Sequence, residues 1–184
     1  MFKNNLFVRC IPGDFIILAE GDHYLDDLGD LQNCFNVVGI GRSDKIRLFL
    51  DSGYGFELVI QDPGSSIRLE NVTITSKLGQ AGLWVHNGAE VTLKDCVVRN
   101  MATGIKLSGE QTVGHFKWSE FLDCQIGVEV EDGARCDISG GLIEDCSVGI
   151  RLTGKTKHLE DSGVTIEDMD NYSVKHIDFV HAED

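Results

Sequence analysis

A glycine followed by an apolar, a variable and an apolar residue recurs along this chain at nearly constant spacing. The copies occupy residues 82–85, 104–107, 127–130 and 149–152, and a weaker copy occupies residues 173–176. A period just above 20 residues, with two-residue alternation inside each copy, predicts a solenoid in which each repeat forms one turn.

A longer pattern precedes each glycine and supplies the turns. It reads apolar, any residue, Asn or Asp, Met or Cys, and two further residues, as in residues 98–104, 121–127 and 143–149. Alternating segments such as 67–69 and 91–93 predict another strand in each repeat. Helical repeats are excluded because no repeat holds about ten periodic residues, and a propeller blade needs about 40. The sequence therefore predicts an all-β fold, a parallel β-helix with turns of about 22–24 residues.

The repeat also suggests how the chain is organised. A length of 184 residues suits a single domain that can bury a core. We expect irregular N-terminal turns or a cap over residues 1–45 and regular turns over residues 46–176. Residues 177–184 are either the end of the stack or a truncated further turn, because His176 replaces the inward aliphatic residue of the other copies.

Stacking the copies assigns their side chains to two sides of the strand. The apolar positions should point inward: Leu83, Val85, Ile105, Leu107, Val128, Val130, Ile150 and Leu152. The middle position should point outward, and it holds Trp84, Lys106, Glu129, Arg151 and Lys175. Opposite charges on paired strands contribute about 0.2–1 kcal/mol each, and a lysine stacked on a tryptophan adds a cation–π contact. We interpret this column as a stabilising ladder or, alternatively, as a binding stripe.

A second column of polar residues lies in the predicted turns. Its members recur with the same period as the glycines, and they are Asn100, Asp123, Asp145 and Asp168. Short polar side chains bond neighbouring backbone groups and tolerate unusual backbone angles. A stack of carboxylates can also bind a hard cation such as calcium. The column is therefore interpreted as turn-capping, with calcium binding as the alternative.

Charge and hydropathy exclude some partners. The net charge of −14 disfavours nucleic acid and suits either solubility or a basic protein partner. No apolar run approaches the roughly 20 residues of a membrane span, and residues 1–10 lack the apolar centre of a signal peptide. We therefore expect no membrane insertion and a cytoplasmic location.

The six cysteines follow the repeat and form no C-x-x-C pair. This spacing favours small buried side chains in a reducing compartment over a metal site. Disulfides between stacked turns are the alternative.

The opening of the chain resembles a known superfamily. Residues 12–24 run Pro-Gly-Asp, strand, turn and Tyr24, and they resemble the start of pectin-lyase-like right-handed parallel β-helices, except that Glu20 stands where that pattern has its second proline. The strand at residues 37–41 resembles the same group. The short turns are most similar to the carbohydrate-binding and sugar-hydrolysis repeats of F-box proteins and of the Shc-binding/Nessun dorma family, and residues 21–32 favour the latter.

These resemblances imply a fold and three alternative functions. The Shc-binding/Nessun dorma family implies a cytokinesis protein that binds the centralspindlin complex at the spindle midzone or midbody, with glycan affinity. The F-box proteins imply a substrate-recognition module of a ubiquitin ligase. Because the pectin-lyase-like fold carries enzymes and non-enzymes, a polysaccharide lyase or hydrolase is the third reading.

The residues favour a non-enzyme. Sugar-cleaving relatives need clustered carboxylates for acid and base work. Of the family's hydrolase motifs only the Asp26-Asp27 pair occurs; Gly114-His115 lacks the following glycine, and the segment 104–106 lacks the arginine. We expect no catalytic residue, no metal and no cofactor.

The predicted function is therefore a non-catalytic interaction module for a protein partner or a glycan. Its binding residues are predicted to be Trp84, Lys106, Glu129, Arg151, His115 and Trp118. His86 and His115 are expected in turns near the two tryptophans, where an aromatic and histidine patch can stack on a sugar or anchor a partner. The alternative is that Trp118 is a packed turn residue.

Overall fold

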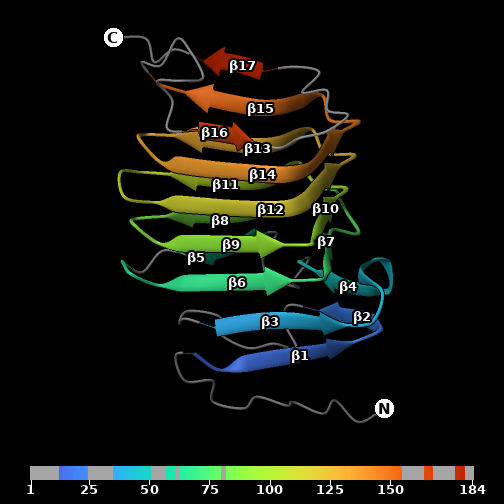
Figure 1. The fold of residues 1–184 in the computed structure, drawn as a ribbon. Helices are drawn as coiled ribbons and strands as arrows, with labels where there is room; N and C mark the ends of the chain where they lie inside the picture. The colour runs from blue at the N-terminus through green and yellow to red at the C-terminus, as the bar shows by residue number, and fades with distance from the viewer. Residues whose placement is uncertain are drawn as a thin grey trace.

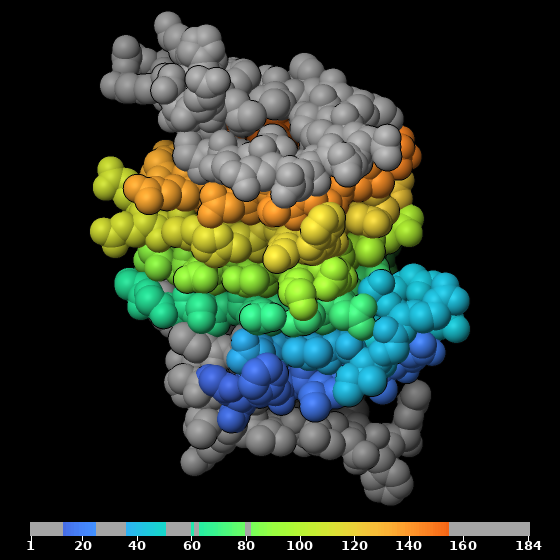
Figure 2. All heavy atoms as spheres, in the orientation of Figure 1, coloured from blue at the N-terminus to red at the C-terminus, as the bar shows by residue number. Residues whose placement is uncertain are grey.

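The chain coils into a stack of turns, each with three sides. The computed structural model describes residues 13–24, 35–50, 57–60, 63–79, 82–154, 164–167 and 177–180. Every strand pairing recorded among them is parallel. Successive turns lie side by side along the axis (Figure 1), and they form successive bands from blue to orange in the space-filling view (Figure 2). The predicted all-β parallel β-helix is confirmed.

Three faces run along the stack. The first face contains β5 (Glu57–Ile60), β8 (Gly82–His86), β11 (Thr103–Ser108), β13 (Ile126–Glu131), β15 (Val148–Thr153) and β17 (Ile177–Val180). The second contains β1 (Phe15–Ala19), β3 (Phe35–Ile40), β6 (Ser66–Glu70), β9 (Glu90–Lys94), the first halves of β12 (Val113–Leu122) and β14 (Arg135–Glu144), and β16 (Val164–Glu167). The third contains β2 (Gly21–Tyr24), β4 (Ile46–Phe49), β7 (Thr73–Thr75), β10 (Val97–Arg99) and the second halves of β12 and β14; the 3-10 helix η1 (Ser43–Lys45) precedes β4. Because β12 and β14 run through the corner, the second and third faces form one sheet.

The core is built from the predicted inward positions. Ile105 pairs with Leu83 and Val128, and Leu107 pairs with Val85 and Val130. All eight predicted inward residues of the first face are at most 3% exposed. Fully burying an aliphatic side chain contributes about 1.5–3 kcal/mol, so each added turn extends one continuous apolar core.

The repeated glycine of the first face has a steric cause. A Cβ at Gly104 would lie 2.6 Å from the carbonyl oxygen of Gly127, and a Cβ at Gly127 would lie 2.7 Å from that of Gly149. A Cβ at Gly82 would likewise lie 2.6 Å from the carbonyl oxygen of Thr103. Only glycine lets the backbones of successive turns approach this closely.

The polar column of the turns adopts left-handed backbone angles. Asn100, Asp123 and Asp145 have φ values of 58°, 53° and 54°. Asn and Asp tolerate this region better than other side chains, which supports the turn-capping interpretation. The Asn100 side chain also donates a 2.6 Å hydrogen bond to the carbonyl of Ser76 in the preceding turn. Asp168 lies outside the described residues.

The last turn corrects the predicted fifth copy at residues 173–176. Strand β17 begins at Ile177, which pairs with Ile150, and Asp178 rather than Lys175 lies opposite Arg151. Cys136 pairs with Gly114 of the preceding turn and with Val164 of the following turn. More residues separate Cys136 from Val164 than separate Gly114 from Cys136, so the extra residues of the longer turn lie before β16. A longer turn thus shifts the register that the sequence pattern implied; Lys175 and His176 lie outside the described residues.

The glycine column makes a direct prediction for Gly104→Ala. The added methyl group would meet the Gly127 carbonyl oxygen and the side chains of Val98 and Phe121, so the free energy of unfolding should fall by roughly 1–3 kcal/mol. Urea denaturation measures this change. The matched control Ser108→Ala, on the outer side of the same strand, should stay within about 0.5 kcal/mol of wild type. Equal stabilities for the two variants would contradict the steric explanation.

Candidate functional site

The predicted outer column exists in register on the first face. Lys106 pairs with Trp84 on one side and with Glu129 on the other, and Glu129 pairs with Arg151. The Lys106 Nζ lies 5.4 Å from the centre of the Trp84 ring, which confirms the cation–π contact. The Trp84 ring in turn lies 5.1 Å from the ring of His86, the last residue of β8.

The charges of this column largely neutralise one another. Lys106 lies 3.0 Å from a carboxylate oxygen of Glu131 and 3.9 Å from one of Glu129. Arg151 lies 3.8 Å from the other oxygen of Glu129, whose side chain is only 13% exposed. Paired and half-buried charges gain most from each other, and they leave little unsatisfied charge for a partner. This geometry favours the stabilising-ladder interpretation of the column.

The two remaining predicted site residues do not join this column. His115 lies in strand β12 on the second face, not in a turn, because it pairs with Thr92 and Asp137 inside the sheet. Its Nδ1 lies 3.0 Å from an Asp137 carboxylate oxygen. Trp118 lies at the corner where β12 turns from the second to the third face, and it is 52% exposed. The structure therefore separates the six predicted residues over two faces and a corner.

Another charged ladder crosses the second face. Glu70 accepts hydrogen bonds from Lys94 and from Arg68, and these cations hold the pKa of the Glu70 carboxyl below its usual range, Lys94 through the larger effect. Glu70 and Lys94 occupy paired positions of β6 and β9. Like the ladder of the first face, this cluster satisfies its own charges.

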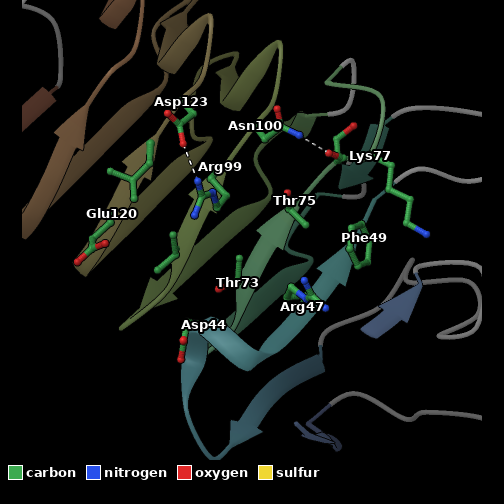
Figure 3. A pocket seen from close by; sticks show the side chains of 13 residues that line it. Asp44, Arg47, Phe49, Thr73, Thr75, Lys77, Arg99, Asn100, Glu120 and Asp123 are labelled. Carbon is green, nitrogen blue, oxygen red and sulfur yellow. Dashed lines mark hydrogen bonds and ion pairs between the residues drawn. The ribbon is translucent and has the colours of Figure 1, made fainter. Parts of the chain in front are cut away.

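A groove lies on the third face, where the sequence predicted no site. Its volume is about 800 Å³, and it crosses β4, β7, β10 and the second half of β12. Figure 3 shows Phe49 and Lys77 on one side, Arg99 and Asp123 on the other, and the threonines of β7 between them. Ligand sites typically measure about 300–1,000 Å³, so this groove has the size of a binding site.

Side-chain size explains why the groove exists. The outward residues of β7 are Thr73 and Thr75, whereas the outward residues of β4 at the same register are Arg47 and Phe49. On the other side, Arg99 of β10 pairs with Thr75. Short side chains between longer ones leave a trough along β7. The Thr73 hydroxyl is not free for a ligand, because it donates a 2.8 Å hydrogen bond to the carbonyl of Ser43.

An aromatic and cationic cluster bounds one side of the groove. The Phe49 and Tyr24 rings stack with their centres 5.3 Å apart. The Lys77 Nζ lies 4.5 Å from the Tyr24 ring centre and 4.9 Å from that of Phe49, and it donates a 2.6 Å hydrogen bond to the Tyr24 hydroxyl. Cation–π contacts of this kind stabilise an exposed site by about 0.5–1 kcal/mol. This side of the groove is therefore held in place before any ligand arrives.

The opposite side of the groove carries a carboxylate without a counter-ion. Arg99 donates a 2.7 Å hydrogen bond to Asp123, so that pair is satisfied. Glu120 lines the groove, and its register neighbours are Val97 and Leu142, which carry no polar side chain. Among the described residues its carboxylate has no hydrogen-bond or ion-pair partner. Glu120 is thus the groove residue best placed to accept hydrogen bonds from a ligand.

Comparison with models of protein families identifies the family of this chain. The family model described as "right handed beta helix region" matches residues 51–175, more than half of the chain. The chain belongs to the right-handed β-helix family. The right-handed β-helix predicted from the sequence is thereby confirmed. This membership defines the fold, while the fold itself hosts many functions.

One curated relative extends the comparison. Protein nessun dorma of Drosophila melanogaster is 26% identical in an alignment 182 positions long, and the alignment covers 79% of this chain and 30% of the relative. The chain therefore spans less than a third of that protein's length. No solved structure matches significantly. Within the part of the chain that the structure describes, no helix has the length and hydropathy of a membrane span.

The pKa of Glu70 generates a pH-dependent prediction. The pKa of Glu70 in the folded chain lies below the usual value of 4.5, so the ionised carboxylate stabilises the fold at pH values above 4.5. This contribution is lost as the pH falls through the pKa of the folded state. Glu70→Gln should therefore cost about 0.5–1 kcal/mol at pH 7, and the difference from wild type should shrink as the pH falls below 4.5. Urea unfolding over a series of pH values tests this. A difference that grows on acidification would contradict the assignment.

Proposed function

We propose that this chain is a non-catalytic β-helix interaction module that binds an extended segment of a basic protein partner in the groove of the third face. The observation that carries the proposal is Glu120, a carboxylate without a partner among the described residues, on one side of an 800 Å³ groove. The net charge of −14 supports a basic partner, because it attracts cations over longer distances. A backbone that runs along β7 would place a lysine or arginine against Glu120.

The cellular role follows from family resemblance. The Shc-binding/Nessun dorma family implies the centralspindlin complex as the partner, and the similarity to Protein nessun dorma supports that choice. We therefore propose a cytoplasmic scaffold at the spindle midzone or midbody during cytokinesis. In this proposal the ion pairs of Lys106, Glu129 and Arg151 stabilise the stack of turns. The alternative interpretation of this column as a binding stripe stays a prediction.

Charge reversal in the groove tests where the partner binds. Glu120→Lys should weaken the binding of purified centralspindlin at least about tenfold, which is about 1.4 kcal/mol, because it places a cation against a basic segment. Isothermal titration calorimetry measures the affinity, and the melting temperature should stay near that of wild type, since Glu120 has no partner to lose among the described residues. Wild-type binding should also weaken as salt is raised.

Two matched variants distinguish the groove from the ladder. Trp84→Ala and Arg151→Glu change the first face and leave the groove intact, so we expect them to lower the melting temperature and to preserve affinity. If they abolish binding while Glu120→Lys binds normally, the ladder is the binding surface and the groove proposal is wrong. Binding of a glycan, but not of the protein, in the same calorimetric assay would replace the protein partner by a sugar ligand.

The absence of catalysis is a separate prediction. Incubation with polygalacturonate or galactan should release no product above the blank, because acid and base work needs two carboxylates. The groove carboxylates Asp44 and Asp123 are held by Arg42 and Arg99. Among the described residues that line the groove, Glu120 is therefore left without a second free carboxylate beside it. Reducing-end assays measure hydrolysis, and absorbance of unsaturated sugars measures lyase activity. Product release that is lost in Glu120→Gln would instead identify a polysaccharide-acting enzyme.

A further inference from the structure

Two cysteines occupy equivalent positions in successive turns. Cys124 and Cys146 follow Asp123 and Asp145 of the left-handed corner. The backbone N–H of Ser147 donates a 3.1 Å hydrogen bond to the carbonyl of Cys124, so the two turns pair directly at these residues. Parallel neighbours lie about 4.8 Å apart, which falls within the Cα separation of about 4.4–6.8 Å that a disulfide spans.

Cys146 is the accessible thiol of the pair, whereas Cys124 is only 4% exposed. Cys124 lines an open depression of about 450 Å³ together with Met101, Gln125 and Ser147. Cys146 is half-buried, whereas Cys96 and Cys136 are almost completely buried. A small solute can therefore reach this corner more readily than either of the other two described thiols.

The environment activates one thiol of the pair. The interaction with the Cys124 side chain lowers the pKa of Cys146 to about 7, and the same contact raises the pKa of Cys124. By contrast, burial raises the pKa of Cys96 to about 12 and holds the pKa of Cys136 well above its usual value. The thiolate is the reactive form of cysteine, so Cys146 is the nucleophile of the pair.

We propose that Cys146 and Cys124 form a peroxide-sensitive dithiol that closes to a disulfide between two successive turns. The Cys146 thiolate attacks one oxygen of hydrogen peroxide, the O–O bond breaks, and hydroxide leaves; Cys146 is then a sulfenic acid. The hydroxide released in this step takes the Cys124 proton and becomes water, and the Cys124 thiolate attacks the sulfenic sulfur. The S–S bond forms, the S–O bond breaks, and the leaving hydroxide takes up the proton that Cys146 gave up on ionisation and becomes the second water. Two thiols are oxidised and one peroxide is reduced to two waters.

The disulfide would tie together the turns that carry the outer ladder. Cys124 precedes β13, which holds Glu129, and Cys146 precedes β15, which holds Arg151. Oxidation therefore fixes the spacing of these two turns, and a thiol such as glutathione reverses it by exchange. The corner adjoins the groove, because Asn100 and Asp123 line both the groove and the depression at Cys124. The oxidation step does not depend on the partner proposed for the groove.

The test is peroxide oxidation of the full chain, followed by non-reducing peptide mapping. Among the four described cysteines, wild type should lose two thiols and yield one peptide pair linked through Cys124 and Cys146. Cys124→Ser should accumulate a sulfenic acid at Cys146 that dimedone traps, and Cys146→Ser should form no disulfide at this corner. The matched control Cys96→Ser should oxidise like wild type.

A second measurement keeps the proposal testable in the unmutated chain. Alkylation of Cys146 by iodoacetamide should show a pH midpoint of about 7 and run at least about tenfold faster than that of Cys96 at neutral pH. Linkage of other cysteines in place of this pair, or equal alkylation rates for Cys146 and Cys96, would overturn the proposal.

Discussion

The close approach of successive turns at one glycine column governs this structure. The carbonyl oxygen of Gly127 occupies the space where Gly104 would carry a Cβ, and Gly149 stands in the same relation to Gly127. Glycine permits this approach, and the strands of the first face pair in register there, so residues with the same place in the repeat lie above one another. Ladders, polar corners and the cysteine pair are all consequences of this single alignment.

The first face could be predicted from the sequence because its signals repeat. Glycine, two inward aliphatics and an outward residue recur in each copy, so both the core and the column from Trp84 to Arg151 follow from alignment alone. The turn role of Asn100 and Asp123 was also predictable, since few side chains accept a left-handed backbone.

The third face could not be predicted in the same way. Strands β7 and β10 are three residues long, which is too short for a periodic pattern. In the next two turns the corresponding residues form the second halves of the longer strands β12 and β14. The groove depends on the sizes of side chains at paired positions, such as Thr75 and Arg99. The sequence alone does not say which residues of these short strands pair. The pairing of Ile177 with Ile150 was unpredictable for a related reason, because a longer turn leaves the periodic pattern.

The corner between the second and third faces shows how neighbouring turns compensate for each other. Its left-handed positions are Asn71, Asp95 and Gly140, but Trp118 occupies the same conformation at a φ of 53°, which costs a bulky side chain about 1–2 kcal/mol. A Cβ at Gly140 would lie 2.4 Å from the Trp118 ring, so glycine in one turn makes room for the tryptophan of the turn before it. Packing against bare backbone offsets the strain, while 52% of the residue's surface stays exposed. At this corner, therefore, the strained tryptophan lies where the adjacent turn has no side chain of its own.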